Sequence, residues 1–286
     1  MELKVENLIK SFEEKRVIKG ADYSFEKGKI YGLLGRNGAG KTTLFNCISG
    51  EMDFDSGKIY MTDEENSESM NYEKIGYVYS TPILPEFLTG YEFIRFFTDI
   101  NKKKIKNIKT PEEYADMVCF DRSDLDKLIK GYSHGMKNKM QMLATVIASP
   151  EVMLLDEPLT SLDVVAAHEM KEMLMNMKKD HIIILSTHIL QLAKDLCDEI
   201  VLLHGGRLAG VADDVYHSAD FEEKLMQMLS AESDEDMWSA DAGLYEQNLS
   251  DDKNKNEKDN LMTDGNTENH TQSDSRTDDY DPYDFD

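Results

Sequence analysis

The chain has 286 residues, of which 40% are hydrophobic, and its formal net charge at pH 7 is −24. That length allows one or two domains with a proper core. Residues 232–286 contain 18 acidic and 4 basic side chains and so contribute −14 of the net charge. We expect no nucleic-acid partner, because the sequence offers no basic face of the kind that binds phosphate backbones.

The three cysteines, Cys47, Cys119 and Cys197, are widely spaced and form no CxxC pair. They indicate neither a zinc site nor a disulfide framework. Residues 1–7 alternate charged and apolar side chains, which predicts a strand and not a signal peptide. No apolar run approaches the roughly 20 residues of a membrane-spanning helix, so we expect a polypeptide that is soluble by itself.

The first third of the chain is predicted to consist mainly of strands. Short strands are expected at residues 3–5, 16–18, 21–25 and 29–34. A glycine-rich turn follows the last of them, and a helix then runs to Gly50. This turn consists of Gly35, Arg36, Asn37, Gly38, Ala39, Gly40, Lys41 and Thr42, with Thr43 next.

A strand, a glycine-rich turn and a helix in this order are typical of a P-loop. Its backbone N–H groups and the helix N-terminus bind phosphate oxygens. Lys41 would reach the β- and γ-phosphates of a nucleotide, and the Thr42 hydroxyl would hold Mg²⁺. An ordinary glycine turn is the alternative reading of the motif.

Further along, strands and helices alternate. We predict a strand at 56–61, a surface loop at 62–71, a strand at 75–79, and a largely helical stretch from 82 to 132. Helices are then expected from about 133 to Pro150, at 164–178 and at 189–197, with strands at 152–155, 182–186, 199–203 and 208–211. Continuously apolar strands between helices indicate a mainly parallel sheet that is covered on both faces.

Polar residues follow several of these strands. Asp156 and Glu157 end one strand and His188 ends another. Ligands of open α/β sheets bind at the carboxyl ends of the strands, so we expect these residues and the P-loop to converge on one nucleotide. Asp156 would hold Mg²⁺, Glu157 would accept a proton from the attacking water, and His188 would contact the γ-phosphate. Alternatively, the two carboxylates cap a helix and the histidine packs on the surface.

Taken together, the motifs resemble those of the ATP-binding subunit of ABC transporters over roughly residues 1–215. The resemblance rests on residues 35–42 (Walker A), 132–136 (in place of the LSGGQ signature), 154–158 (Walker B with the catalytic glutamate), 161–163 (D-loop) and 186–188 (H-switch). It implies a P-loop ATPase core with an antiparallel β subdomain and an α-helical subdomain at about 82–131. It also implies that the chain binds ATP and Mg²⁺ and hydrolyses ATP.

The resemblance further implies that each ATP lies between two subunits. Ser133 and the Gly135 N–H would contact the nucleotide of the partner, and Asp163 of the D-loop would also belong to the nucleotide-binding residues. Phe12 is similar in position to the aromatic residue that stacks on adenine, although it would serve equally well as a hydrophobic anchor. The expected partners are a second ATP-binding subunit, identical or different, and a separately encoded membrane permease, which would hold this chain on the cytoplasmic face of the membrane.

Two positions depart from the family pattern. Ser80 replaces the glutamine that normally follows a strand like 75–79. In the signature, Tyr132, His134 and Met136 replace the usual leucine, glycine and glutamine. In this family the glutamine contributes an oxygen to Mg²⁺ and links the site to the membrane subunit. We therefore predict that hydrolysis or its coupling is altered, with Ser80 as a weaker metal contact.

The segment at 132–137 is most similar to the corresponding segment of small bacterial export-type subunits, such as those of drug or peptide efflux. We expect an ABC-type ATP-binding domain at 1–229 that powers export. An ATP-gated dimerising switch with little turnover is the alternative. Residues 230–286 are expected to be an acidic, disordered tail, either inert or binding a partner through aromatic residues such as Trp238.

Overall fold

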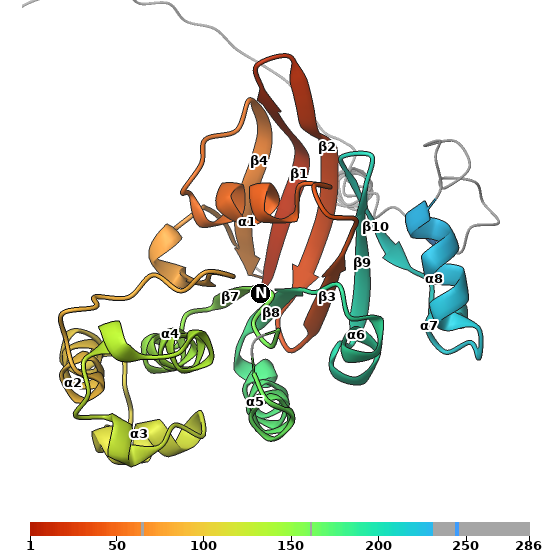
Figure 1. Ribbon diagram of the computed structural model, residues 1–286. Helices are drawn as coiled ribbons and strands as arrows, with labels where there is room; N and C mark the ends of the chain where they lie inside the picture. The colour runs from red at the N-terminus through yellow and green to blue at the C-terminus, as the bar shows by residue number, and fades with distance from the viewer. Residues whose placement is uncertain (64–65, 161, 231–243, 246–286) are drawn as a thin grey trace, which may run out of the picture. The chain divides into compact units, whose positions relative to one another are not determined.

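The computed structural model describes residues 1–63, 66–160, 162–230 and 244–245 (Figure 1). The strands are β1 (Glu2–Phe12), β2 (Lys15–Glu26), β3 (Ile30–Leu34), β4 (Ser56–Asp63), β5 (Asn66–Ser69), β6 (Ile75–Val78), β7 (Val152–Asp156), β8 (Ile182–Ser186), β9 (Glu199–His204), β10 (Arg207–Val211) and β11 (Leu244–Tyr245). The helices are α1 (Lys41–Ser49), α2 (Gly90–Asn101), α3 (Pro111–Met117), α4 (His134–Ala148), α5 (Val164–Met177), α6 (Leu190–Leu196), α7 (Asp213–Tyr216) and α8 (Phe221–Ser230). Short 3₁₀ turns lie at Tyr72–Lys74, Arg122–Asp124, Ile129–Gly131 and Lys178–Asp180.

The larger sheet carries the parallel strands that the sequence predicts. Its order is β11-β10-β9-β3-β8-β7-β6, and β3 lies between β9 and β8 and runs parallel to both. Strands β7 and β6 continue the parallel arrangement on one side, whereas β10 and β11 are antiparallel additions on the other. The carboxyl ends of β3, β7 and β8 therefore meet at one edge of the sheet, and the α/β fold with a mainly parallel sheet is confirmed.

The smaller sheet is antiparallel, with the order β2-β1-β4-β5. The predicted separate strands at 16–18 and 21–25 are wrong, because β2 continues through Gly20. Gly20 has φ of 90° and Asn7 has φ of 45°, and the register of β1 shifts between Val5 and Leu8. The glycine thus accommodates an irregularity within the strand and does not end it. The predicted loop at 62–71 is also wrong, since β4 extends to Asp63 and pairs with β5.

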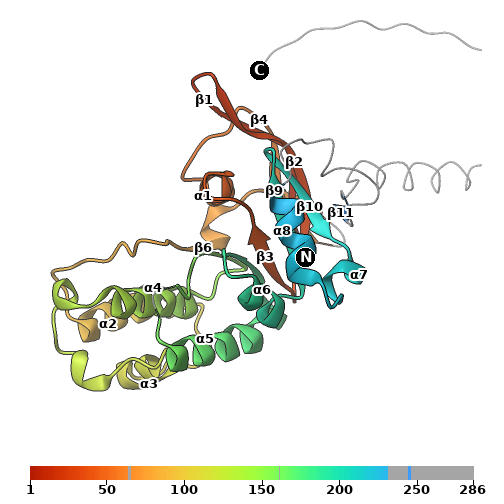
Figure 2. The ribbon, with the colours of Figure 1, turned by 45° about the vertical axis from the view of Figure 1, so that its right-hand side comes forward.

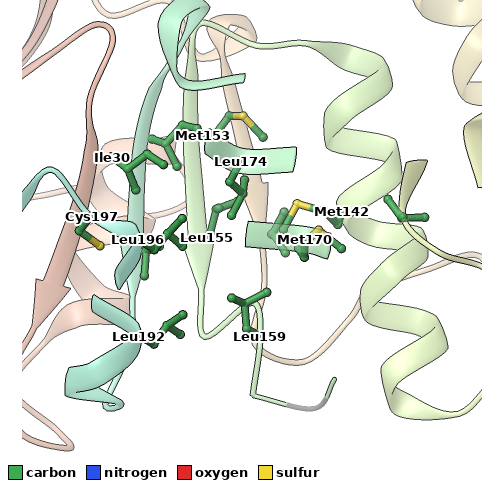
Figure 3. Close-up of a cluster of buried hydrophobic side chains, with 14 of the residues drawn as sticks. Ile30, Met142, Met153, Leu155, Leu159, Met170, Leu174, Leu192, Leu196 and Cys197 are labelled. Carbon is green, nitrogen blue, oxygen red and sulfur yellow. The ribbon is translucent and has the colours of Figure 1, made fainter. Parts of the chain in front are cut away.

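The larger sheet is buried on both faces. In β7 the side chains of Val152 and Leu154 pack in the cluster of the antiparallel sheet and α1, whereas Met153 and Leu155 pack among the helices on the opposite face. Figure 3 shows part of the helix-side cluster, in which Leu155 lies near Leu174 of α5. Continuous burial explains why β7 is apolar at every position before its final aspartate.

Helices α2, α3 and α4 lie side by side in a helical region beyond β6 (Figures 1 and 2). Thr89 begins α2 and Thr110 begins α3, each with a capping box. In each box the threonine hydroxyl accepts a hydrogen bond from the N–H three residues on, and the carboxylate of a glutamate accepts one from the threonine N–H. The stretch at 82–132, predicted to be largely helical, is interrupted by loops and short 3₁₀ turns. It holds two α-helices before α4 begins.

The sequence reasoning missed α7 and α8. Phe221, Leu225 and Met228 of α8 are buried in the helix-side cluster, and their spacing of four and three residues is the pattern that would have revealed the helix. Within the part of the chain that the structure describes, none of the helices combines the length and the apolar character needed to cross a membrane. The predicted acidic tail lies, apart from residues 230 and 244–245, outside the described residues, and the domain boundary at 229 remains a prediction.

Candidate functional site

The glycine-rich loop joins the carboxyl end of β3 to the N-terminus of α1. Gly38 has φ of 80° and Gly40 has φ of 108°, which are left-handed conformations that side chains disfavour. Gly40 is the N-cap residue of α1, and no side chain caps that helix end. The first N–H groups of α1 and the positive end of its dipole are therefore available to an anion at this loop.

Lys41 is the first residue of α1 and lies inside the loop. Its Nζ donates to the carbonyl oxygen of Gly35 at 2.8 Å and also contacts that of Arg36 at 3.4 Å. Burial lowers the pKa of Lys41, an effect that the nearby charges of Glu157 and Asp156 oppose. The ammonium group thus has polar partners within the loop and faces two carboxylates across the cavity described below.

Asp156 connects the loop to two strands of the sheet. Thr42 Oγ1 donates to Asp156 Oδ2 at 2.9 Å, and Ser186 Oγ at the end of β8 donates to Asp156 Oδ1 at 2.5 Å. The side chain of Asp156 is only 4% exposed. A hydroxyl and a carboxylate oxygen in contact form a hard-donor set that fits Mg²⁺, which typically takes one or two protein oxygens plus phosphate oxygens and water.

Glu157 follows in a left-handed conformation with φ of 53°, which turns its side chain away from the line of β7. Its N–H donates to Ser186 Oγ at 3.1 Å. Its carboxylate accepts a hydrogen bond of 3.0 Å from Thr160 Oγ1, and Oε2 lies 2.6 Å from His188 Nδ1. The two residues that the sequence predicts for catalysis are therefore in contact, and Thr160 is a further partner that the sequence reasoning missed.

A cavity of about 570 Å³ opens over these groups. The predicted residues that line it are Asn37, Gly38, Gly40, Lys41, Thr42, Thr43, Ser80, Asp156 and Glu157. Gly35 and His188 instead line a neighbouring cavity of about 390 Å³, which Asn37 also borders. The P-loop and the two carboxylates thus converge as predicted, with His188 joined to them through Glu157.

The remaining predicted residues line neither of these cavities. Ser133 is exposed at the N-cap of α4, where its Oγ accepts from the Met136 N–H at 3.2 Å, and Gly135 lies in the first turn. Asp163 caps α5, and the hydrogen bond from the Ala166 N–H lowers the pKa of its carboxyl. Ala39 lies within the loop and donates its N–H to the Arg36 carbonyl.

The sequence around Phe12 suggests a turn after residues 7–11, but the structure makes Phe12 the last residue of β1. Its side chain is 43% exposed, and Lys10 Nζ lies 5.1 Å from its ring centroid. The role of Phe12 in stacking on a base remains a prediction.

Besides Thr160, three residues that the sequence reasoning did not assign to this cavity also line it. Val17 of β2 borders the glycine loop, and His134 and Asn138 lie one turn apart on α4. The spacing of four residues places His134 and Asn138 on one helix face, which a helical projection of the segment after Ser133 would have indicated.

Comparisons with known proteins show which family the chain resembles. A family model described as ABC transporter matches residues 18–160. The bacitracin transport ATP-binding protein of Enterococcus faecalis is 31% identical, over 72% of this chain and 67% of the relative. A lantibiotic transport ATP-binding protein of Streptococcus pyogenes is 28% identical, over 78% of this chain and 95% of the relative.

Solved structures resemble the fold. The structure of an ATP-binding subunit of an ABC transporter superposes with a TM-score of 0.68 at 25% sequence identity, covering 81% of this chain and all of that one. A dimeric ATP-binding cassette in a post-hydrolysis state, bound to ADP and Pi, superposes with a TM-score of 0.61 at 18% identity, covering 72% of this chain and 96% of that one.

Proposed function

The chain belongs to the ABC transporter family, and on this premise we propose that it is the subunit that hydrolyses ATP to power export through a separately encoded membrane permease. As an ABC ATP-binding subunit it is an ATPase of a transport system. The observation that carries the proposal is the single cavity at which Lys41 and Thr42 of the P-loop meet Asp156 and Glu157.

Each of these groups has a role in the proposed reaction. The loop N–H groups and Lys41 bind the phosphates, and Lys41 exchanges its carbonyl partners for phosphate oxygens. Thr42 and Asp156 are the residues that would hold Mg²⁺, which when bound neutralises charge on the phosphates. Their existing contact at 2.9 Å supports this assignment.

Glu157 is the proposed general base. An attacking water transfers its proton to the carboxylate as its oxygen bonds to the γ-phosphorus, and the bond to the leaving ADP oxygen breaks with its electron pair. His188, at 2.6 Å from the carboxylate, orients Glu157 and contacts the γ-phosphate. Phe12 is the proposed contact of the adenine base.

The partners follow from the same premise. We propose that Ser133, Gly135 and Asp163, which lie at exposed helix N-termini, contribute to the nucleotide site of a second ATP-binding subunit. The permease would contact the helical region of α2 and α3 and hold the chain on the cytoplasmic face of the membrane. Relatives named for bacitracin and lantibiotic transport support a peptide-like or drug-like export substrate.

The decisive experiment measures Mg²⁺-dependent ATP hydrolysis by the purified full chain and by the Glu157→Gln variant, together with oligomeric state with and without ATP. We expect the wild type to hydrolyse ATP. The variant should lose at least about 100-fold in kcat, because it lacks the general base, but should form a stable dimer with ATP. A wild type that neither binds nor hydrolyses ATP would overturn the proposal.

A second candidate function is an ATP-gated dimerising switch with little turnover. Ser80 favours it, because this short side chain borders the cavity where the family has a longer glutamine. The same measurement separates the two functions. ATP-dependent dimerisation with negligible turnover in the wild type would support the switch, whereas turnover that depends on Glu157 would exclude it.

A further inference from the structure

Gln141 is a buried polar residue of α4 whose side chain binds the loop after β6. Its Nε2 donates to the carbonyl oxygen of Tyr79 at 3.0 Å, and its Oε1 accepts from the N–H of Ile83 at 3.1 Å. The side chain is only 5% exposed. Both ends of one amide group are thus engaged by two backbone groups four residues apart.

The two partners bracket Ser80. The segment between them leaves β6, passes Ser80 at the border of the nucleotide cavity and continues toward the helical region. On its other side Tyr79 is anchored to the core, where its hydroxyl donates to Glu51 and its ring packs at 4.3 Å from that of Tyr77. The loop is therefore held between the core and α4.

Gln141 also continues a helix face that borders the site. His134 and Asn138 line the nucleotide cavity, and Gln141 follows Asn138 by three residues on the same face. Successive turns of α4 thus face first the cavity and then the loop that carries Ser80. Any displacement of α4 would be transmitted to this loop through the two hydrogen bonds.

Ser80 has a short side chain where the family has a longer glutamine, so the position of its backbone decides whether its hydroxyl reaches the cavity. The Ser80 hydroxyl has one rotatable bond between it and the backbone, so its reach into the cavity is set by where the loop lies. Breaking the contacts of a buried amide leaves polar groups unpaired and releases the loop.

We infer that Gln141 is a positioning residue of the ATPase reaction, whose amide fixes the loop at residues 79–83 so that Ser80 faces the metal-nucleotide complex. This inference rests on the proposed ATPase function. Gln141 does not line the cavity and acts through the loop.

The test replaces Gln141 by leucine, which has a similar volume and no hydrogen-bonding group, in the full chain. We expect the Mg²⁺ concentration for half-maximal ATP hydrolysis to rise, and kcat to fall, each by about tenfold. Gln141→Glu, which keeps the acceptor but sets a carboxylate oxygen against the Tyr79 carbonyl oxygen, should show a change at least as large. The matched control is Gln191→Leu at an exposed position of α6, where the lost hydrogen bond joins only Asp195. Both values should stay within about twofold of wild type.

A cycle with Ser80→Ala separates positioning from a general structural role. If Gln141 acts through Ser80, the double variant should be no worse than the poorer single variant. Losses that multiply, or a lower melting temperature with an unchanged Mg²⁺ dependence, would overturn the inference. If the wild type itself fails to hydrolyse ATP, the proposed function is wrong. The inference about Gln141 is then tested by ATP binding, which should need more Mg²⁺ in Gln141→Leu than in the wild type.

Discussion

Glu157 Oε2 lies 2.6 Å from His188 Nδ1, so the residue after β7 and a residue shortly after β8 are in direct contact. Thr160 Oγ1 donates to the same carboxylate oxygen at 3.0 Å. The carboxylate of the proposed base is therefore oriented by two side chains that belong to different parts of the chain. We expect this orientation to matter for proton transfer from water to the carboxylate.

The first prediction concerns this contact. In His188→Ala the carboxylate of Glu157 loses one of its two side-chain partners, and we expect kcat to fall by about 100-fold while ATP affinity changes by less than about threefold. Steady-state hydrolysis and equilibrium ATP binding measure the two effects. His168→Ala, on the exposed face of α5, is the matched control. Equal activity of the two variants would contradict the role assigned to His188.

The second prediction concerns Ser80. A glutamine at this position would reach further into the cavity, so Ser80→Gln should lower the Mg²⁺ requirement and raise the hydrolysis rate by about fivefold. The same change at the exposed Ser123 should have no effect. The prediction is wrong if Ser80→Gln leaves both the rate and the Mg²⁺ dependence at their wild-type values.

The third prediction tests whether Ser133 serves the nucleotide of a partner chain. Lys41→Ala and Ser133→Arg should each be inactive when assayed alone. In a symmetric pair that exchanges subunits, a mixed dimer contains one site with both residues intact, so an equal mixture should regain about a quarter of wild-type activity. No recovery on mixing, with subunit exchange verified by labelling, would exclude a composite site between two copies.

The fourth prediction concerns the cysteines. Burial raises the pKa of Cys47 to about 11 and also raises that of Cys197, whereas Cys119 is partly exposed. Because the thiolate is the reactive form, a thiol reagent at pH 8 should modify Cys119 alone in the native protein and all three cysteines after denaturation. Cys119→Ser should abolish native labelling. Rapid native labelling of Cys47 would contradict its burial on the inner face of α1.

The raised pKa of Cys47 predicts that the protein loses stability at alkaline pH. The folded state retains the proton of Cys47 up to a higher pH than the unfolded chain, in which the ordinary value is 9.0. Its contribution to the free energy of unfolding is therefore complete below pH 9 and declines as the pH rises toward 11. Thermal denaturation at pH 8 and pH 10 should show a smaller pH effect in Cys47→Ala.

Local features of the chain were predictable where residue type alone requires a conformation. Gly38 and Gly40 permit the positive φ angles of the loop, and the apolar run before Asp156 requires a strand covered on both faces. The predictions failed where pairing with a neighbouring strand overrode the conformation that the local sequence suggests. Gly20 suggests a turn by itself, but in the sheet it lies opposite an irregularity of β1 and the strand continues.

The sequence by itself therefore determined the family and its ATPase activity, and it predicted which residues bind phosphate and which carboxylates act, because these depend on short motifs with local backbone requirements. Only the tertiary structure decided which of these groups touch. Thr42 bonds to Asp156 across 114 positions of the chain, Glu157 to His188 and Thr160, and Gln141 to the loop around Ser80. Such contacts depend on strand register and helix packing, which arise from the whole core and which no short segment specifies.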